Sequence, residues 1–126
     1  MIRILLAEDD DVMRQYLVRA LQRSNYAVVD FDRGTPALAM VEAGEQFDLL
    51  LTDIVMPEMD GIELAQKVGL IDPKMRVMFI TGFSAVSLKA GQSLPNAKVL
   101  SKPFHLRDLV LEVDRLFEAE SLSSRN

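Results

Sequence analysis

Acidic side chains directly follow two apolar runs of the sequence. Glu8 and Asp9 come after the run at residues 2–7, and Asp53 follows Leu49–Thr52. If the fold brings these carboxylates together, their negative charges repel one another unless a cation neutralises them. The sequence has no Cys and no His near these residues, so the ligands are oxygen atoms and the suitable cation is a hard divalent ion. Mg²⁺ fits best because it needs only one or two protein carboxylates.

A hydroxyl group and an ammonium group end two further apolar runs. Thr81 closes the run at residues 76–81, and Lys102 follows the run at residues 97–101. An aspartate beside a metal can attack a phosphoryl group and form an acyl phosphate. That transfer depends mainly on neutralising charge on the phosphoryl oxygens. Asp53 is therefore a candidate nucleophile, with Lys102 supplying positive charge and Thr81 a hydrogen-bond donor.

Three other polar residues have ordinary structural explanations. Asp10 and Asp11 precede a stretch with helical spacing, where acidic side chains suit the positive end of the helix dipole. The single histidine, His105, has no other metal-binding side chains around it. We expect it to lie in the first turn of a helix without a catalytic role.

Apolar runs alternate along the chain with stretches of helical periodicity. The runs lie at 2–7, 27–31, 48–52, 76–81 and 97–101, and most are continuous, as in strands covered on both faces. A weaker helix is expected at 84–93. The repeat predicts a parallel sheet with helices on both faces, whose strand ends share one ligand-binding edge. The expected helical stripes are Met13, Leu17, Ala20 and Leu21; Ala37, Leu38 and Val41; Leu64, Ala65, Val68 and Ile71; and Leu106, Leu109, Val110, Val113, Leu116 and Phe117.

Length and composition restrict the class of protein. The 126 residues, 49% hydrophobic and 26% charged, are typical of one globular domain. A net charge of -5 opposes binding to nucleic acid or to an anionic membrane. No apolar segment reaches the roughly 20 residues of a membrane span, and we expect no signal peptide. We expect a cytoplasmic protein with one domain at residues 1–118, a short C-terminal tail at 119–126 and no output domain.

The chemistry-bearing residues and their neighbours resemble the signature of response-regulator receiver domains of the CheY-like superfamily. The resemblance covers residues 1 to about 118 and implies a flavodoxin-like (βα)5 fold, an α/β three-layer sandwich with a parallel five-stranded sheet in order 2-1-3-4-5. It rests on Glu8-Asp9, Leu51-Thr52-Asp53-Ile54-Val55-Met56-Pro57-Glu58-Met59-Asp60-Gly61, Thr81-Gly82 and Lys102-Pro103-Phe104.

The resemblance implies roles for the acidic residues and for one backbone group. Asp53 would be the phosphoacceptor. Asp9 would bind Mg²⁺ directly and Glu8 would act through water. Asp53 and the backbone carbonyl of Val55 would complete the protein ligands of the metal.

The resemblance also implies how the phosphoryl group is held. Thr81 would hydrogen-bond it and Lys102 would form an ion pair with it. Many receivers carry an aromatic residue three positions before this lysine, whose rotation reports phosphorylation, but here the position is Val99. The usual coupling is therefore not expected, and Phe83 and Phe104 are either its replacements or simple packing residues.

A narrower resemblance concerns the output. Residues 79–86, and especially 99–113, are similar to single-domain response regulators of alphaproteobacteria that act as adaptors for the ClpXP protease. Those adaptors promote degradation of ClpXP substrates when they are unphosphorylated and become inactive when they are phosphorylated. The implied partners are a histidine kinase or histidine phosphotransfer protein, ClpXP and its substrates. The alternatives are a CheY-like motility regulator or a phosphate shuttle acting on another partner.

An enzymatic alternative is a metal-dependent phosphohydrolase of the haloacid dehalogenase type. Such enzymes use a second Asp two residues after the nucleophile as general acid, and Val55 stands there. The sequence therefore favours a phosphoacceptor switch that is not an enzyme. Because Val55 and Phe83 are apolar and should flank the route of attacking water, we also expect slow self-dephosphorylation.

Overall fold

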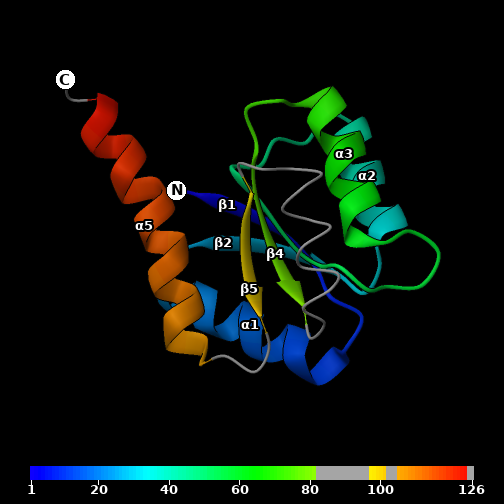
Figure 1. Cartoon of the computed structure of the whole chain (residues 1–126), viewed down its shortest axis with the longest axis horizontal. Coiled ribbons are helices and arrows are strands. Elements are labelled where there is room, and N and C mark those ends of the chain that lie inside the picture. Colours follow the sequence, from blue (N-terminus) through cyan, green and yellow to red (C-terminus); the bar gives the residue numbers. More distant parts are fainter. Residues whose placement is uncertain (82–96, 102–104, 125–126) are drawn as a thin grey trace.

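The structure is a computed structural model that describes residues 1–81, 97–101 and 105–124 (Figure 1). The helix expected at 84–93 and the residues Phe83, Lys102 and Phe104 lie outside the described residues.

Five parallel strands form one sheet in the order β2-β1-β3-β4-β5, which confirms the predicted order. Ala7 at the end of β1 pairs with Thr52 of β3. Asp53 at the end of β3 pairs with Ile80 of β4. The carboxyl ends of these strands therefore meet at one edge of the sheet. The strands are β1 (Arg3–Ala7), β2 (Ala27–Phe31), β3 (Leu49–Asp53), β4 (Arg76–Thr81) and β5 (Lys98–Ser101).

The helices cover both faces of this sheet. Figure 1 shows α1 and α5 on one side and α2 and α3 on the other. The last helix continues beyond the boundary expected near residue 118, because residues 119–122 include Ala, Glu and Leu, which favour helix. The described helices are α1 (Asp11–Arg23), α2 (Gly34–Glu42), α3 (Gly61–Ile71) and α5 (Leu106–Ser124).

Alternate residues of each strand pack on opposite faces of the sheet. In β1, Leu5 and Ala7 belong to the core beneath α2 and α3. Ile4 and Leu6 belong to the core beneath α1 and α5. Because both faces are covered, consecutive positions must be apolar, which explains the continuous apolar runs. Full burial of one large aliphatic side chain contributes about 1.5–3 kcal/mol.

The stripe of α3 is shorter than its periodicity predicts. Leu64, Ala65 and Val68 are buried, whereas Ile71 is 47% exposed. The neighbouring Leu70 is also exposed. The prediction that Ile71 belongs to the buried stripe is therefore wrong: the stripe ends at Val68, and the final residues of α3 face solvent.

A polar contact ties α5 to the turn before β2. The Tyr26 hydroxyl donates a hydrogen bond to Oδ1 of Asp114, and the Tyr26 ring lies 6.5 Å from that of Phe117. Burial, together with the hydrogen bond and the charge of Asp114, raises the pKa of Tyr26. Since deprotonation is disfavoured, the hydroxyl remains a donor across the physiological pH range.

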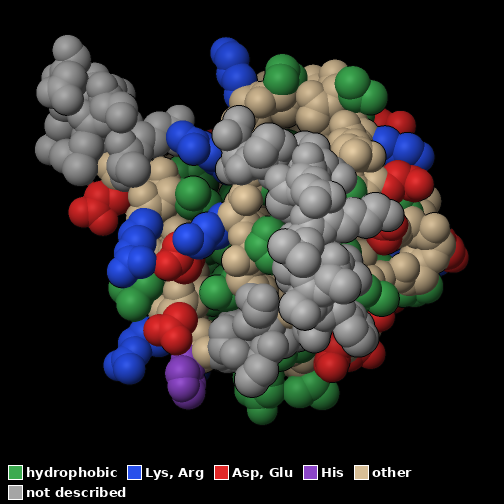
Figure 2. Space-filling model, in the orientation of Figure 1, with side chains coloured by type: hydrophobic (Ala, Val, Ile, Leu, Met, Phe, Trp, Pro, Cys, Tyr) green, Lys and Arg blue, Asp and Glu red, His purple; other side chains and the backbone are tan. Residues whose placement is uncertain are grey.

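The outer surface of α5 carries both signs of charge. Glu112 pairs with Lys98 at 3.3 Å and with Arg115 at 2.9 Å. Figure 2 shows basic and acidic side chains mixed over this part of the visible face. Leu111, which lies off the apolar stripe, is exposed. None of the described helices is both long and apolar enough to cross a membrane.

Candidate functional site

Two acidic side chains lie directly after the end of β1, at the shared edge of the sheet. Glu8 follows the strand directly and is fully buried. Its backbone N–H donates to the carbonyl of Phe31 at 3.1 Å, which continues the pairing of β1 with β2 by one residue. Asp9, the next residue, is exposed. One carboxylate is thus held inside the protein and its neighbour stands at the surface.

The third carboxylate, that of Asp53, lies at the end of β3. Asp53 is the last residue of the strand and is only 6% exposed. Its Oδ1 accepts a hydrogen bond from the backbone N–H of Val55 at 3.3 Å, and its carbonyl accepts one from the Thr52 hydroxyl at 2.8 Å. The bond from Val55 restricts the rotation of this nearly buried side chain, so its carboxylate has a defined direction.

Glu8, Asp9 and Asp53 form one cluster. A carboxylate oxygen from each lies within 4.8 Å of those from the other two. The donor set consists of carboxylate oxygens, which are the ligands that hard divalent cations prefer. The structure therefore brings together the three acidic residues that the sequence indicates, in an arrangement that fits a divalent metal ion.

Two other residues singled out in the sequence, Thr81 and Val99, lie on β4 and β5. Thr81 is the last residue of β4 and is fully buried. It pairs with Ser101, the last residue of β5. Lys102 lies outside the described residues. Val99 is partly buried and packs against the core beneath α2 and α3.

The two acidic residues assigned to the helix have that role. Asp10 is the N-cap of α1, and its Oδ1 accepts a hydrogen bond from the backbone N–H of Met13 at 3.0 Å. Asp11 lies in the first turn and pairs with Arg14 at 2.6 Å. Arg14 was not predicted as a site residue, because an Arg in a helix is usually a solvated surface charge.

A close backbone approach at the start of α3 was also not predicted. A Cβ atom added to Gly61 would lie 2.0 Å from the carbonyl oxygen of Asp53, and the Gly61 N–H donates to the Ile54 carbonyl at 2.8 Å. Asp60 caps the helix by accepting from the Glu63 N–H at 2.8 Å. In the sequence, the Asp60-Gly61 pair signals only a turn, and contact with Asp53 is visible only once the strand and helix are packed.

Apolar side chains are exposed on the segments that follow the clustered carboxylates in the chain. Val12 and Tyr16 occupy one exposed stripe of α1, one turn apart. Val55, two residues after Asp53, is also exposed. The helix that follows Glu8 and Asp9 and the segment that follows Asp53 thus present apolar groups to solvent.

Comparison with known proteins places this site in a family. Residues 4–114 match the protein family described as response regulator receiver domain. The chain belongs to the response-regulator receiver family. This receiver is 58% identical over 118 residues to the response regulator receiver protein CpdR of Brucella abortus (strain 2308), covering 93% of this chain and 98% of CpdR.

Solved structures of receivers have the same fold. A response regulator receiver protein from Sinorhizobium medicae WSM419 is 29% identical with a TM-score of 0.85, covering 94% of this chain and 95% of that one. A CheY-like receiver domain protein from Methanospirillum hungatei JF-1 is also 29% identical, with a TM-score of 0.83 and 98% of both chains covered. The CheY-like, flavodoxin-like fold predicted from the sequence is confirmed.

Membership of the family decides between the switch and the enzyme. Receivers are phosphoacceptor switches of two-component signalling, so this chain is a switch rather than a phosphohydrolase. The sequence supports the same conclusion. Hydrolases of the haloacid dehalogenase type carry a second Asp two positions after the nucleophile, and here that position is Val55, which cannot act as an acid.

Proposed function

We propose that Asp53 accepts a phosphoryl group from a histidine kinase or histidine phosphotransfer protein, with Mg²⁺ bound beside it. The observation that carries this proposal is the cluster in which the nearly buried Asp53 and the carboxylates of Glu8 and Asp9 lie within 4.8 Å of one another. Asp9 would bind the metal directly and Glu8 would act through water, and Asp53 and the Val55 carbonyl would complete the protein ligands.

The residues of the chain act mainly by orientation and charge. An Asp53 carboxylate oxygen attacks the phosphorus of a phosphohistidine, the P–N bond breaks, and an acyl phosphate remains on Asp53. The N–H of Val55 helps to hold the direction of that carboxylate. Thr81 donates a hydrogen bond to the phosphoryl group and Lys102 pairs with it. The metal, when bound, supplies neutralising charge to the phosphoryl oxygens.

Changing Asp9 to Asn is expected to weaken Mg²⁺ binding by at least about tenfold and to slow phosphorylation by acetyl phosphate to a similar degree. The reason is that both processes use the same carboxylate. Calorimetric titration with Mg²⁺ and the rate of phosphorylation measure the two effects. The matched control is Asp10→Asn, because Asn caps α1 as well as Asp does and Asp10 lies outside the cluster. Unchanged Mg²⁺ affinity in Asp9→Asn would contradict this assignment of the metal.

For the output, we propose that the protein is a cytoplasmic adaptor for ClpXP proteolysis, active when unphosphorylated. The 58% identity to CpdR, together with the resemblance of residues 99–113, supports this polarity.

We propose that the exposed Val12 and Tyr16 of α1 contact the phosphodonor, because they lie on the helix that follows Glu8 and Asp9.

A capture experiment tests the switch. The protein is immobilised with and without beryllofluoride, an acyl-phosphate mimic, and bound proteins are identified by mass spectrometry. The ATPase subunit of ClpXP is expected only with the unmodified protein. Equal capture in both states, or capture only with the mimic, would contradict the proposed polarity.

The lifetime of the acyl phosphate depends on the groups beside it. Changing Val55 to Asn is expected to speed its decay severalfold, because a polar side chain two positions after Asp53 can hold a water in line with the P–O bond. Loss of phosphorylated protein with Mg²⁺ present, followed over time, gives the rate. Leu70→Asn is the control, since Leu70 is exposed at the opposite end of α3 from the site. Equal decay in Val55→Asn and the wild type would show that Val55 does not limit access of water.

A further inference from the structure

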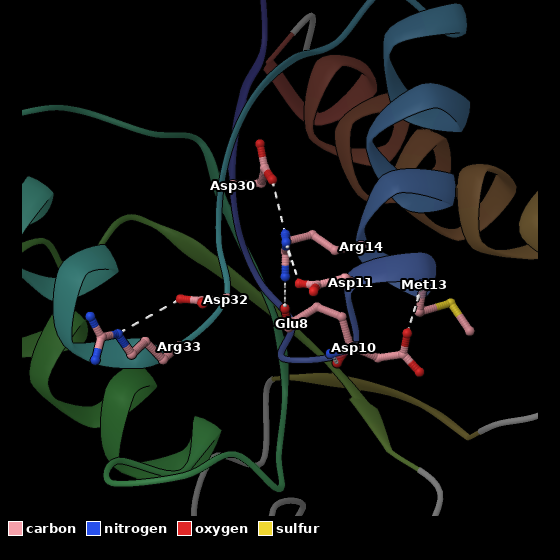
Figure 3. Close-up of polar contacts among 8 residues, drawn as sticks. All are labelled: Glu8, Asp10, Asp11, Met13, Arg14, Asp30, Asp32 and Arg33. Carbon is pink, nitrogen blue, oxygen red and sulfur yellow. Dashed lines mark hydrogen bonds and ion pairs between the residues drawn. The ribbon is translucent and has the colours of Figure 1, made fainter.

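One arginine links three elements around the acidic cluster. Nη1 of Arg14 donates to the carbonyl oxygen of Glu8 at 2.8 Å, and Nη2 donates to Oδ1 of Asp11 at 2.6 Å. Its Nε donates to Oδ2 of Asp30 at 3.2 Å. Figure 3 shows the guanidinium lying between these groups. With its side chain only 15% exposed, Arg14 joins the end of β1 to the first turn of α1 and to β2.

The bond to the Glu8 carbonyl bears directly on Asp9. That oxygen belongs to the peptide unit between Glu8 and Asp9, and a peptide unit is planar. A bond that holds this oxygen therefore also holds the N and Cα atoms of Asp9, which lie in the same plane. Two further bonds hold the same segment: the Glu8 N–H to the Phe31 carbonyl at 3.1 Å, and the Asp10 N–H to Oε2 of Glu8 at 3.3 Å.

We propose that Arg14 is a positioning residue of the metal site: it holds the peptide between Glu8 and Asp9 so that both carboxylates converge with Asp53. The proposal rests on the proposed function of the cluster as a divalent-metal site. Arg14 acts through the backbone of the two residues and does not itself contact the metal.

The chemistry of arginine suits this task. A guanidinium presents several donors in a rigid fork and can bond three acceptors in different directions at once, which a lysine ammonium on a flexible stem does less well. Burial by itself lowers the pKa of Arg14, but hydrogen bonds and Coulombic attraction to Asp11 and Asp30 outweigh it and raise the pKa. The side chain therefore stays charged and keeps all its donors.

A positioning role and a purely electrostatic role of Arg14 predict opposite effects of its removal on Mg²⁺ affinity. A positive charge near a cation site repels the cation, so removing it should tighten Mg²⁺ binding if charge alone mattered. If Arg14 instead holds the peptide, removing it should weaken Mg²⁺ binding, because supporting contacts around metal ligands are typically worth about 10–100-fold in affinity.

The test compares Arg14→Gln with Arg19→Gln, which removes the same charge from an exposed position of the same helix. Calorimetric titration with Mg²⁺ is expected to give a dissociation constant about tenfold higher for Arg14→Gln and unchanged or slightly lower for Arg19→Gln. Arg14→Lys, which keeps the charge but loses the fork, is expected to lie between Arg14→Gln and the wild type. Unchanged or tighter binding in Arg14→Gln would overturn the proposal.

A second measurement needs no metal. Hydrogen exchange at the Glu8 and Asp10 amides, followed by NMR with chelator present, is expected to speed up in Arg14→Gln and to be unchanged in Arg19→Gln. Equal exchange in all proteins would overturn the positioning role even if the metal site is real. Conversely, absence of Mg²⁺ binding by the wild type would refute the proposed function and with it any role of Arg14 in metal binding, while the exchange rates would still show whether Arg14 holds the peptide between Glu8 and Asp9. If Arg14→Gln fails to fold, the same measurements on Arg14→Lys decide the question.

Discussion

Replacing Gly61 with Ala is expected to lower the free energy of unfolding by about 3 kcal/mol or more and to abolish efficient phosphorylation. The added Cβ would lie 2.0 Å from the carbonyl oxygen of Asp53 and 2.9 Å from its carbonyl carbon. Both are backbone atoms, so relief requires α3 to move away from β3. That movement would shift the backbone that carries the phosphoacceptor. The gain of about 1 kcal/mol from placing Ala instead of Gly in a helix is too small to offset it.

The same helix contains the matched control. Gly69 also lies in α3, but a Cβ added there meets no atom within 4 Å. Gly69→Ala is therefore expected to raise the free energy of unfolding by about 0.5–1 kcal/mol and to leave phosphorylation unchanged. Urea unfolding and phosphorylation by acetyl phosphate measure both effects. Equal stability of the two variants would show that β3 and α3 do not approach as closely as the structure indicates.

Changing Asp53 to Ala is expected to remove phosphorylation completely and to leave the protein permanently active in proteolysis. The reason is that this variant keeps the fold but has lost the carboxylate that receives the phosphoryl group. Degradation of an adaptor-dependent substrate by ClpXP should continue when the phosphodonor is added, whereas degradation with the wild type should fall. Asp48→Ala is the control, since Asp48 precedes the opposite end of β3 and should leave the switch intact. Loss of degradation with Asp53→Ala would contradict the polarity of the switch.

Much of the fold could be predicted because the sheet is covered on both faces. Each strand needs apolar residues at successive positions, and this makes runs such as Leu49–Leu51 conspicuous in the sequence. The polar residues at the ends of those runs stand out for the same reason. Parallel pairing then brings Glu8, Asp9 and Asp53 to one edge, so the acidic cluster follows from strand order alone.

Features that depend on packing between elements could not be predicted. The contact of Gly61 with Asp53 arises from the angle at which α3 meets β3. The three bonds of Arg14 require β1, β2 and α1 to be in place. Ile71 continues the helical period of α3 but is exposed, and periodicity does not show at which residue the buried stripe of a helix ends. In each case the sequence determines the residue, and only the tertiary arrangement determines its neighbours.

Phosphorylation of the purified wild-type protein tests the central claim most directly. The protein is incubated with acetyl phosphate and Mg²⁺, and the modified peptide is identified by mass spectrometry with and without hydroxylamine, which cleaves acyl phosphates. The account predicts a single phosphoryl group on Asp53 that requires Mg²⁺ and is released by hydroxylamine. Phosphorylation at another residue, or none in a protein shown to be folded and to bind Mg²⁺, would contradict it.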